Sequence, residues 1–380
     1  MITPIKIGIN ASKVNEGGRA GAENYTYNLI KALSQLDHQN RYVLFFKYPF
    51  DHQFLVELTS GNPNFKAVLV PNSMSFNQLG LLRAFLQHPV DVFFTAVHTV
   101  PLLLGKRPKL VPMIHGLEYK KDRKSKVQIL GLNFFAHQTI RKAVKVLVPS
   151  TYTKKAILAS NWGTADNKIE VVAEGVSEIF YKRSGFEIQK AKNKYGIGAE
   201  EYLVSVSTIQ PRKNYAKLIE AFALLKKELT NPLKLVICGK TGWDYQDVLE
   251  SPEKFGVKND VIFAGRVDDA DLPYLLSGAK AFVSTSLEEG FGLPLLEAMA
   301  CETPCAVSKI DPFVEIAQDF AYYFDPSSAK DIKASLLKLL TAGENNESMV
   351  QNAKERTKIY TWEETAKKTL TVLEDIFKNL

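Results

Sequence analysis

Long apolar runs, paired cysteines and low-complexity segments are missing from this 380-residue chain. No stretch approaches the ~18 consecutive apolar residues of a transmembrane helix, and the start "MITPIKIGIN" lacks the basic and apolar regions of a secretory signal. We therefore expect a cytoplasmic protein. The three cysteines show no CxxC spacing and no nearby histidine pair, which favours buried thiols over a metal or disulfide role at Cys238, Cys301 and Cys305.

Acidic residues are scarce in the first half of the chain. Residues 1–185 hold 24 Lys and Arg against 12 Asp and Glu, out of 48 and 41 in the whole chain. A basic face of this kind attracts phosphates, anionic lipid or nucleic acid, or it is only a solvated surface. Because no nucleic-acid-binding motif or basic patch interleaved with aromatics appears, we expect no nucleic-acid partner.

Apolar, β-rich runs alternate with helix-period segments in both halves. This pattern predicts an α/β protein whose parallel sheets are covered on both faces, and the length fits about two domains. The expected strands are residues 5–9, 42–46, 66–70, 90–94, 110–114, 144–148 and 169–172, then 203–207, 233–238, 261–264, 281–284, 305–308 and 322–324. Between the halves, the polar and charged residues 176–200 predict a hinge.

Two glutamates flank a glycine loop in the stretch "LEEGFGLPLLEAMACETPCAVS", residues 287–308. Pro294 suits the first turn of a helix that follows a strand, and we expect Glu297 in that same turn. Glu289 precedes the loop, so both carboxylates can flank one small ligand and accept hydrogen bonds from its hydroxyls. The alternative is that Glu297 only complements the helix dipole while Glu289 is solvated.

The loop itself suits a close approach of backbone to a ligand. Gly290 and Gly292 permit conformations that a Cβ would block, so the amides of Phe291, Gly292 and Leu293 can point at a bound group. The helix N-terminus directly behind them favours an anion.

The segment "SLEEGFGLPLLEAMACETP" resembles the E-x7-E signature of retaining glycosyltransferases of the large family 4. The resemblance covers nearly the whole chain and implies the GT-B fold, in which two Rossmann-like domains face each other across a cleft. It implies that Glu289 contacts the donor sugar, that Gly290, Phe291, Gly292 and Leu293 form the loop on sugar and phosphate, and that Glu297 holds the ribose hydroxyls.

The same resemblance sets the expected domains. Residues 1–185 form the acceptor-side domain, residues 186–360 form the nucleotide-sugar-binding domain, and residues 361–380 form a helix that crosses back to the first domain. Val267, after "VIFAGR", is expected near the nucleotide base.

A second loop, in "VSTIQPRKNYAKLIEAF", places Arg212 and Lys213 between a strand and a helix. Two cations at the C-terminal end of a strand suit a diphosphate through charge-assisted hydrogen bonds. The alternative is a solvated basic turn. The segment is similar to a family segment that has glycine where this chain has Ser207.

Two candidate sites lie in the first half. His115 directly follows an apolar strand in "LVPMIHGLEY", and it resembles a family histidine that contacts the donor sugar, although Gly116 replaces the usual aspartate. Gly17 and Gly18 lie between the first strand and the first helix and resemble the glycine loop that closes over the ligands. The alternatives are a structural histidine and a surface loop.

No metal or cofactor is expected beyond the nucleotide-diphosphate sugar as co-substrate. The "DDAD" segment places Asp269 and Asp271 at DxD spacing, but it reads as an acidic helix start before "LPYLLSGAKAF". Arg212 and Lys213 would take the role of a divalent ion. No carboxylate nucleophile is evident, and the resemblance implies front-face attack in which the donor phosphate takes the acceptor proton.

Residues 118–135 place a basic cluster directly before an apolar stretch. Cations beside apolar residues suit the surface of an anionic membrane, and many acceptors of this family are lipid-linked. We therefore hypothesise peripheral contact at the cytoplasmic membrane face; the alternative is the buried face of a crossover helix behind a solvated loop. The cluster consists of Lys120, Lys121, Arg123, Lys124 and Lys126.

These observations favour a retaining glycosyltransferase that moves a hexose, such as mannose, onto a glycan or lipid-linked acceptor in polysaccharide synthesis. Within the same fold, a nucleotide-sugar epimerase or a phosphorylase is the alternative. An NAD(P)-dependent oxidoreductase is more remote, because no G-x-G-x-x-G fingerprint follows a strand here.

Overall fold

A computed structural model of the protein describes residues 4–12, 14, 21–71, 76–97, 99–117, 126–160, 162–343 and 345–378. The chain divides into two compact units. Unit 1 comprises Met1–Gly175 and Tyr360–Leu380, and unit 2 comprises Val176–Ile359. Within the described ranges, no helix is both long and apolar enough to cross a bilayer.

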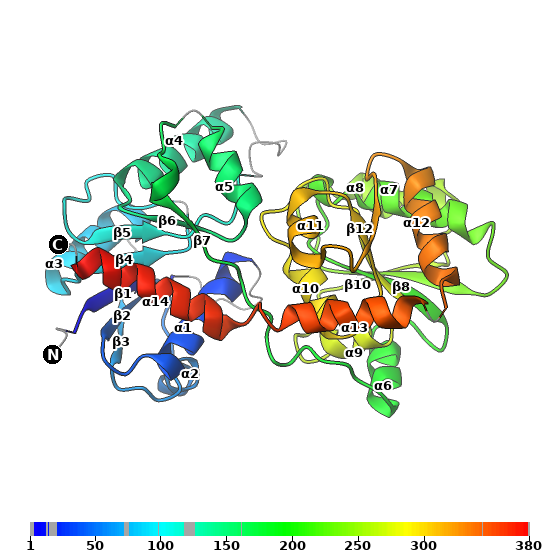
Figure 1. The fold of residues 1–380 in the computed structure, drawn as a ribbon, viewed down its shortest axis with the longest axis horizontal. Coiled ribbons are helices and arrows are strands. Elements are labelled where there is room, and N and C mark those ends of the chain that lie inside the picture. The colour runs from blue at the N-terminus through cyan, green and yellow to red at the C-terminus, as the bar shows by residue number, and fades with distance from the viewer. Residues whose placement is uncertain are drawn as a thin grey trace. The chain divides into compact units, whose positions relative to one another are not determined.

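Unit 1 is built on a five-stranded parallel sheet in the order β3-β2-β1-β4-β5 (Figure 1). Two further strands, β6 and β7, pair with each other, and a bridge from Met113 to Leu147 joins β6 to the residue after β5. The strands are β1 Lys6–Asn10, β2 Arg41–Phe46, β3 Phe65–Leu69, β4 Val92–Thr95, β5 Lys109–Pro112, β6 Val146–Val148 and β7 Ile169–Val171.

Helices cover both faces of this sheet, because residues of the central strands are apolar on both sides. Ile7, Ile9 and Leu44 pack in one core cluster with helices α1 and α14, whereas Phe45 and Phe93 belong to a second cluster. The helices of unit 1 are α1 Ala22–Leu36, α2 His52–Leu58, the π-helical turn Phe76–Gly80, α3 Leu81–Gln87, α4 Lys126–Lys142, α5 Thr151–Leu158, the 3-10 turn Asp166–Lys168 and α14 Trp362–Lys378.

Unit 2 repeats the architecture with a six-stranded parallel sheet in the order β10-β9-β8-β11-β12-β13. Its strands are β8 Glu201–Val206, β9 Leu233–Cys238, β10 Val261–Gly265, β11 Ala281–Ser284, β12 Cys305–Ser308 and β13 Tyr322–Phe324. Its helices are α6 Phe186–Lys194, the 3-10 turn Pro211–Lys213, α7 Tyr215–Lys226, α8 Gln246–Lys254, α9 Leu272–Ser277, α10 Leu293–Ala300, α11 Asp311–Ala317, α12 Ala329–Thr341 and α13 Asn345–Thr357.

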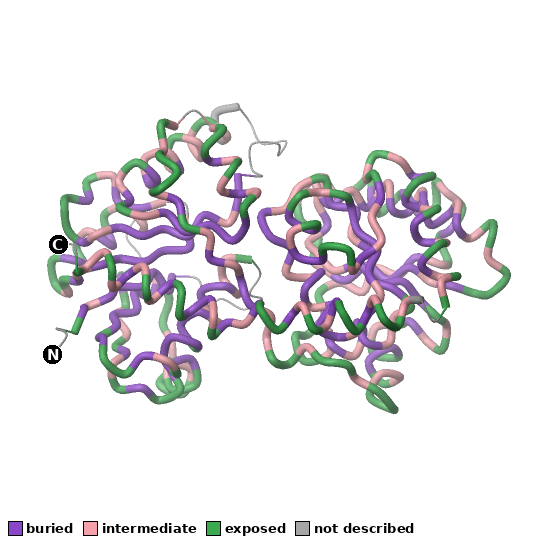
Figure 2. The backbone as a smooth tube through the Cα atoms, viewed as in Figure 1, coloured by how far each residue is buried: buried purple, intermediate pink, exposed green. Residues whose placement is uncertain are grey.

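The burial pattern follows from this layering. Figure 2 shows the inner strands of each unit buried and the outer sides of the helices exposed. The three cysteines are free and buried, as predicted, and burial raises the pKa of Cys238 and of Cys301 to about 12. Both sheets are parallel and covered on two faces, which confirms the predicted α/β class.

The division between the units falls earlier than residue 185, the boundary expected from the sequence. Residues 176–185 belong to unit 2 because their backbone and side chains bond to α9. Lys182 Nζ donates to the carbonyl oxygen of Ser277 at 3.1 Å, and the backbone N–H of Arg183 donates to Ser277 Oγ at 2.9 Å. The sequence indicated that this segment is polar, but it did not indicate which of the two units the segment packs against.

The chain returns to unit 1 at Tyr360, and helix α14 packs against α1. Trp362, Ala366 and Leu373 of α14 belong to the core cluster of unit 1. At this return point the backbone passes directly against Gly175: a Cβ placed on Gly175 would lie 2.3 Å from the backbone nitrogen of Trp362. The glycine is therefore required where the chain leaves and re-enters unit 1.

Candidate active site

The strand order places the predicted site at a topological switch point. In unit 2, β8 and β11 are neighbours, and their connections leave toward opposite edges of the sheet. Ligands of open parallel sheets bind at such points, outside the C-terminal ends of the strands. The loop after β8 carries Arg212 and Lys213, and the loop after β11 carries Glu289. Arg212, Lys213 and Glu289 thus come from the two central loops of unit 2.

Backbone and side-chain hydrogen bonds hold these two loops together. The N–H of Leu287 donates to the carbonyl oxygen of Arg212 at 2.8 Å. Thr285 Oγ1 donates to the carbonyl oxygen of Lys213 at 3.0 Å. Asn214 sits in the left-handed region, with φ of 58°, and thereby turns the chain from the 3-10 turn into α7. The positions of the two cations are therefore fixed by the backbone.

Arg212, Lys213 and Glu289 form an ion triad. Lys213 Nζ donates to Glu289 Oε1, and Arg212 Nη1 donates to Glu289 Oε2 at 3.1 Å. Ser286 Oγ adds a hydrogen bond to Glu289 Oε1 at 2.8 Å. The Lys213 side chain is 9% exposed and the Glu289 side chain 12%, against 26% for Arg212. The structure thus brings three of the predicted residues into direct contact.

The electrostatics of the triad keep Glu289 ionised. Burial alone raises the pKa of this carboxyl, but the charges of Lys213 and Arg212 and the hydrogen bonds from Lys213 and Ser286 outweigh it and lower the pKa to about 2. At neutral pH the carboxylate is therefore an acceptor of hydrogen bonds. It is a poor base, because its proton affinity is low.

The glycine loop is held against α11. Gly292 has φ of 129°, and a Cβ there would lie 2.8 Å from Phe313 Cε1, so no larger residue fits without displacing that ring. Gly290 and Phe291 are buried, and Leu293 begins α10. Gly292 therefore has a backbone conformation that requires glycine, as predicted, while the approach of the loop amides to a ligand stays a prediction.

Glu297 lies just beyond the helical turn in which the sequence predicted it. Helix α10 begins at Leu293, so Glu297 is its fifth residue and lies beyond the first turn. The expectation of a first-turn position was wrong because Pro294, at the second helical position, does not mark the first residue of the helix. Glu297 is half-buried on α10. Val267 is buried and lies two residues after the end of β10, a strand that β9 separates from β8.

Asp271, in the acidic segment before α9, forms hydrogen bonds within unit 2. Asp271 is the residue that precedes α9, as expected of a helix start. Its carboxylate accepts from Lys194 Nζ at 2.6 Å and from Tyr195 Oη at 2.9 Å. The hydrogen bond from Lys194 lowers the pKa of Asp271.

His115 lies in unit 1, after β5, and has a carboxylate partner. His115 Nδ1 lies 2.9 Å from Glu174 Oε1, and the ring meets the Tyr25 ring edge-on with centroids 4.9 Å apart. Glu174 is a residue that the sequence analysis did not select.

Several predicted residues lie outside the described residues or in different units. Gly17, Gly18 and the basic residues 118–125 lie outside the described residues. His115 belongs to unit 1 and the ion triad to unit 2. Ser286 and Thr285, which hold the triad and its backbone, were missed because isolated hydroxyl residues carry no distinctive spacing.

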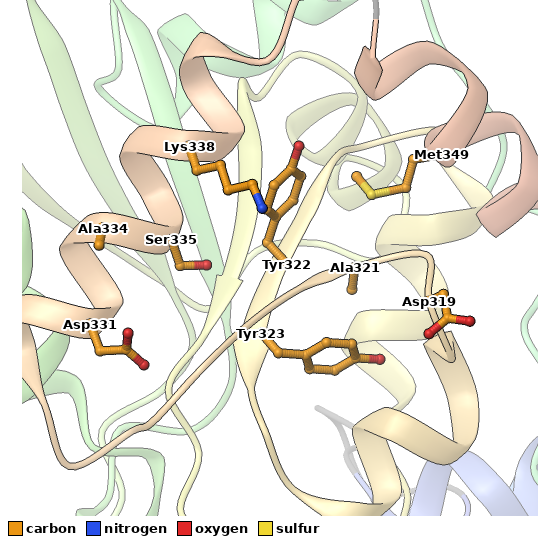
Figure 3. A pocket seen from close by; sticks show the side chains of 9 residues that line it. All are labelled: Asp319, Ala321, Tyr322, Tyr323, Asp331, Ala334, Ser335, Lys338 and Met349. Carbon is orange, nitrogen blue, oxygen red and sulfur yellow. The ribbon is translucent and has the colours of Figure 1, made fainter.

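A separate cavity of about 490 Å³ lies beside β13, between α12 and α13 of unit 2. Figure 3 shows Tyr322 and Lys338 side by side in it, with Ser335 and Met349 around them. None of the predicted site residues lines this cavity. This cavity and the ion triad are therefore different places on unit 2.

Comparison with known families is consistent across both units. The model "Glycosyltransferase Family 4" matches residues 19–178, and the model "Glycosyl transferases group 1" matches residues 187–356. Among solved structures, that of Anabaena Alr3699/HepE in complex with UDP and glucose aligns with a TM-score of 0.77 and 19% identity, covering 98% of this chain and 100% of that one. The glycosyltransferase WaaG aligns with a TM-score of 0.73 and 15% identity, covering 96% and 99%.

Curated relatives are similar in sequence over part of their length. The Escherichia coli "O-antigen chain mannosyltransferase B" is 31% identical over 62% of this chain and 61% of its own. The Salmonella typhimurium "O-antigen chain mannosyltransferase RfbU" is 30% identical over 64% of this chain and 63% of its own. The chain thus spans about three fifths of these relatives, and 25% of the longer E. coli mannosyltransferase WbdA.

Two Rossmann-like units with an E-x7-E loop beside an Arg-Lys pair define the class of GT-B glycosyltransferases. The two matched models together take in most of both units, and the chain belongs to glycosyltransferase family 4.

The pKa of Glu289 predicts a pH-dependent stability. Its folded pKa of about 2 lies below the usual value of 4.5, so the stabilisation is fully present above pH 4.5 and is lost as the pH falls toward 2. We expect the difference in free energy of unfolding between wild type and Glu289→Gln to shrink by about 2 kcal/mol between pH 6 and pH 3. Urea unfolding at both pH values measures it.

Glu253→Gln is the matched control, because Glu253 forms an exposed ion pair with Lys258 in the same unit. It should change the free energy of unfolding by less than about 0.5 kcal/mol at either pH. If the free energies of unfolding of wild type and Glu289→Gln differ by the same amount at pH 6 and pH 3, the low pKa assigned to Glu289 is contradicted.

Proposed function

We propose that this chain is a retaining glycosyltransferase that transfers a hexose from a nucleotide-diphosphate sugar to a glycan or lipid-linked acceptor in cell-envelope polysaccharide synthesis. The observation that carries the proposal is the ion triad of Arg212, Lys213 and Glu289 at the switch point of unit 2. Mannose is the sugar we favour, because the relatives named above are mannosyltransferases of O-antigen chains.

The two cations suit the diphosphate of the donor. A guanidinium has five N–H donors and an ammonium three, so Arg212 and Lys213 can contact a diphosphate as well as Glu289. As the glycosidic bond breaks, negative charge grows on the diphosphate, and fixed cations stabilise that charge without reorganising. The backbone hydrogen bonds of both loops provide this fixation.

The acidic residues suit the hydroxyls of the donor. Glu289 stays ionised at neutral pH and accepts hydrogen bonds from the transferred sugar, while Glu297 of α10 holds the ribose. A carboxylate already bound by two cations is a weak nucleophile. We therefore favour front-face attack with retention, in which the donor phosphate takes the proton of the acceptor hydroxyl and the new glycosidic bond forms on the face that the diphosphate leaves.

A panel of UDP-, GDP- and dTDP-sugars tests the function. We expect one donor to raise the thermal stability of the protein and to be hydrolysed slowly in the absence of acceptor. The anomeric configuration of the transferred sugar, read by NMR, should match that of the donor. Absence of binding and of hydrolysis with every donor would refute the proposed activity.

Substitutions in the site should abolish most turnover while the fold persists. We expect Arg212→Ala and Glu297→Ala each to lower kcat/KM by about 10- to 100-fold, because each removes a hydrogen bond to a charged or hydroxyl group of the donor. Lys213→Ala should do the same and also lower stability, because it leaves the buried Glu289 with one cation fewer. Lys217→Ala, in a half-buried ion pair with Glu220 on α7, is the matched control. Donor turnover at the wild-type rate in the site variants would overturn the assignment.

Added divalent metal should be unnecessary for activity. The motivation is the cationic pair Arg212 and Lys213, together with the engagement of Asp271 by Lys194 and Tyr195. We expect the rate in EDTA to equal the rate in added Mg²⁺ or Mn²⁺. Loss of activity in EDTA that Mn²⁺ restores would show that the pair does not replace a metal ion.

We also propose that α4 contacts an anionic membrane. Its inner side is buried, with Ala136 and Ile140 at 0% and 1% exposure, whereas Leu130 and Phe134 are 67% and 49% exposed. Residues 130 and 134 are four apart and share a face of the helix. The basic cluster of residues 120–126 precedes this face in the sequence, and cations beside exposed apolar side chains favour anionic lipid.

Cosedimentation with phosphatidylglycerol vesicles tests this contact. We expect strong binding at low salt and weak binding in about 0.5 M salt, because exposed charges are screened. Binding should fall when Lys120, Lys121, Arg123, Lys124 and Lys126 become Ser, and when Leu130 and Phe134 become Ser. Phe186→Ser, at a 77% exposed position of unit 2, is the matched control. If the wild type does not bind the vesicles at low salt, the proposed membrane contact is wrong and a soluble acceptor is favoured.

A further inference from the structure

Glu174 is a buried carboxylate whose bond to His115 has no role in the fold assigned so far. Its side chain is 6% exposed, and its oxygen Oε1 lies 2.9 Å from His115 Nδ1. A buried carboxylate is costly unless it is paired or hydrogen-bonded. The pairing with His115 therefore determines how both side chains are held.

The chemistry of the pair defines what His115 presents. An ionised carboxylate only accepts hydrogen bonds, so Nδ1 carries the proton and donates to Glu174. The other ring nitrogen, Nε2, is buried and has no hydrogen-bond partner among the described residues. A buried ring nitrogen without a partner is costly, and a ligand hydroxyl that bonds to it removes that cost. The side chain as a whole is 19% exposed, so a ligand can reach part of the ring.

The backbone holds Glu174 rigidly in this position. The preceding carbonyl, that of Ala173, accepts from Thr365 Oγ1 of α14 at 2.8 Å. The following residue, Gly175, lies against the backbone of Trp362. On the other side of the ring, Tyr25 packs edge-on against His115. Both the carboxylate and the imidazole are therefore fixed by α1, α14 and the exit from unit 1.

We propose that Glu174 is a positioning residue of the transfer reaction: it holds His115 with the proton on Nδ1 and thereby directs Nε2 to a substrate hydroxyl. The inference rests on the proposed glycosyltransferase function and adds to it a residue that acts through His115. Glu174 does not touch the substrate. It sets the orientation of the imidazole that does.

A double-mutant cycle separates this role from a structural one. We expect Glu174→Ala to lower kcat by about 10-fold or more with a smaller change in KM, and Glu174→Gln, which keeps an acceptor oxygen of the same reach, to recover most of the loss. In the His115→Ala background, Glu174→Ala should have no further effect on kcat, because its target is gone. Equal losses in both backgrounds would overturn the proposal.

Asp37→Asn is the matched control for removing a buried, hydrogen-bonded carboxylate from unit 1. Asp37 is 4% exposed and accepts from Tyr42 Oη at 2.6 Å, away from His115. We expect it to lower the stability of the protein while leaving the coupling between residues 115 and 174 unchanged. A comparable loss of kcat in Asp37→Asn would show that destabilisation of unit 1 alone explains the result.

NMR of the ligand-free protein with ¹⁵N-labelled histidine gives a readout that does not depend on turnover. The His115 signals, assigned by their absence in His115→Ala, should show a protonated Nδ1 in the wild type and a changed pattern in Glu174→Ala. An unprotonated Nδ1 in the wild type would refute the inference and leave the proposed function standing. Failure of the wild type to use any nucleotide sugar would refute the proposed function, whatever the state of His115.

Discussion

The pairing of Glu289 with Lys213 and Arg212 is the interaction on which the site of unit 2 depends. A carboxylate and an ammonium this deeply buried are stable only together, because each alone would lose its hydration without compensation. The triad therefore fixes the loop after β8 against the loop after β11, and Thr285 and Leu287 repeat the connection through the backbone. The charged side chains that suit a ligand therefore also hold the two loops of the site together.

This arrangement gives the site its geometry before any ligand binds. Thr285 Oγ1 donates hydrogen bonds to the carbonyl oxygens of Lys213 and Asn214 and thereby positions the loop that carries the two cations. A diphosphate therefore meets donors that are already in place. The N-terminus of α10 and the loop around Gly292 border the same carboxylate in sequence. A preorganised set of donors of this kind lowers the reorganisation that accompanies bond cleavage.

Much of the fold followed from the sequence, because fully buried parallel strands are continuous apolar runs. All thirteen expected strands lie within two residues of the observed starts and ends, and β9, β11, β12 and β13 coincide with the expected ranges. The partners of the polar segment 176–185 could not be predicted, since its bonds to Ser277 join residues far apart in the sequence. For the same reason, Arg212, Lys213 and Glu289 were selected as a set of ligands for the donor, but not as ligands of one another. Glu174 was missed because a lone glutamate has no pattern until His115 is placed beside it.

Gly175 has a consequence for how the protein is made. Unit 2 is inserted into unit 1, since the chain leaves at Gly175 and returns at Tyr360, and the two points lie against each other. Helix α14 supplies Trp362, Ala366 and Leu373 to the core of unit 1, yet it is synthesised after the whole of unit 2. During translation, all of unit 2 is therefore synthesised before α14 can complete the core of unit 1.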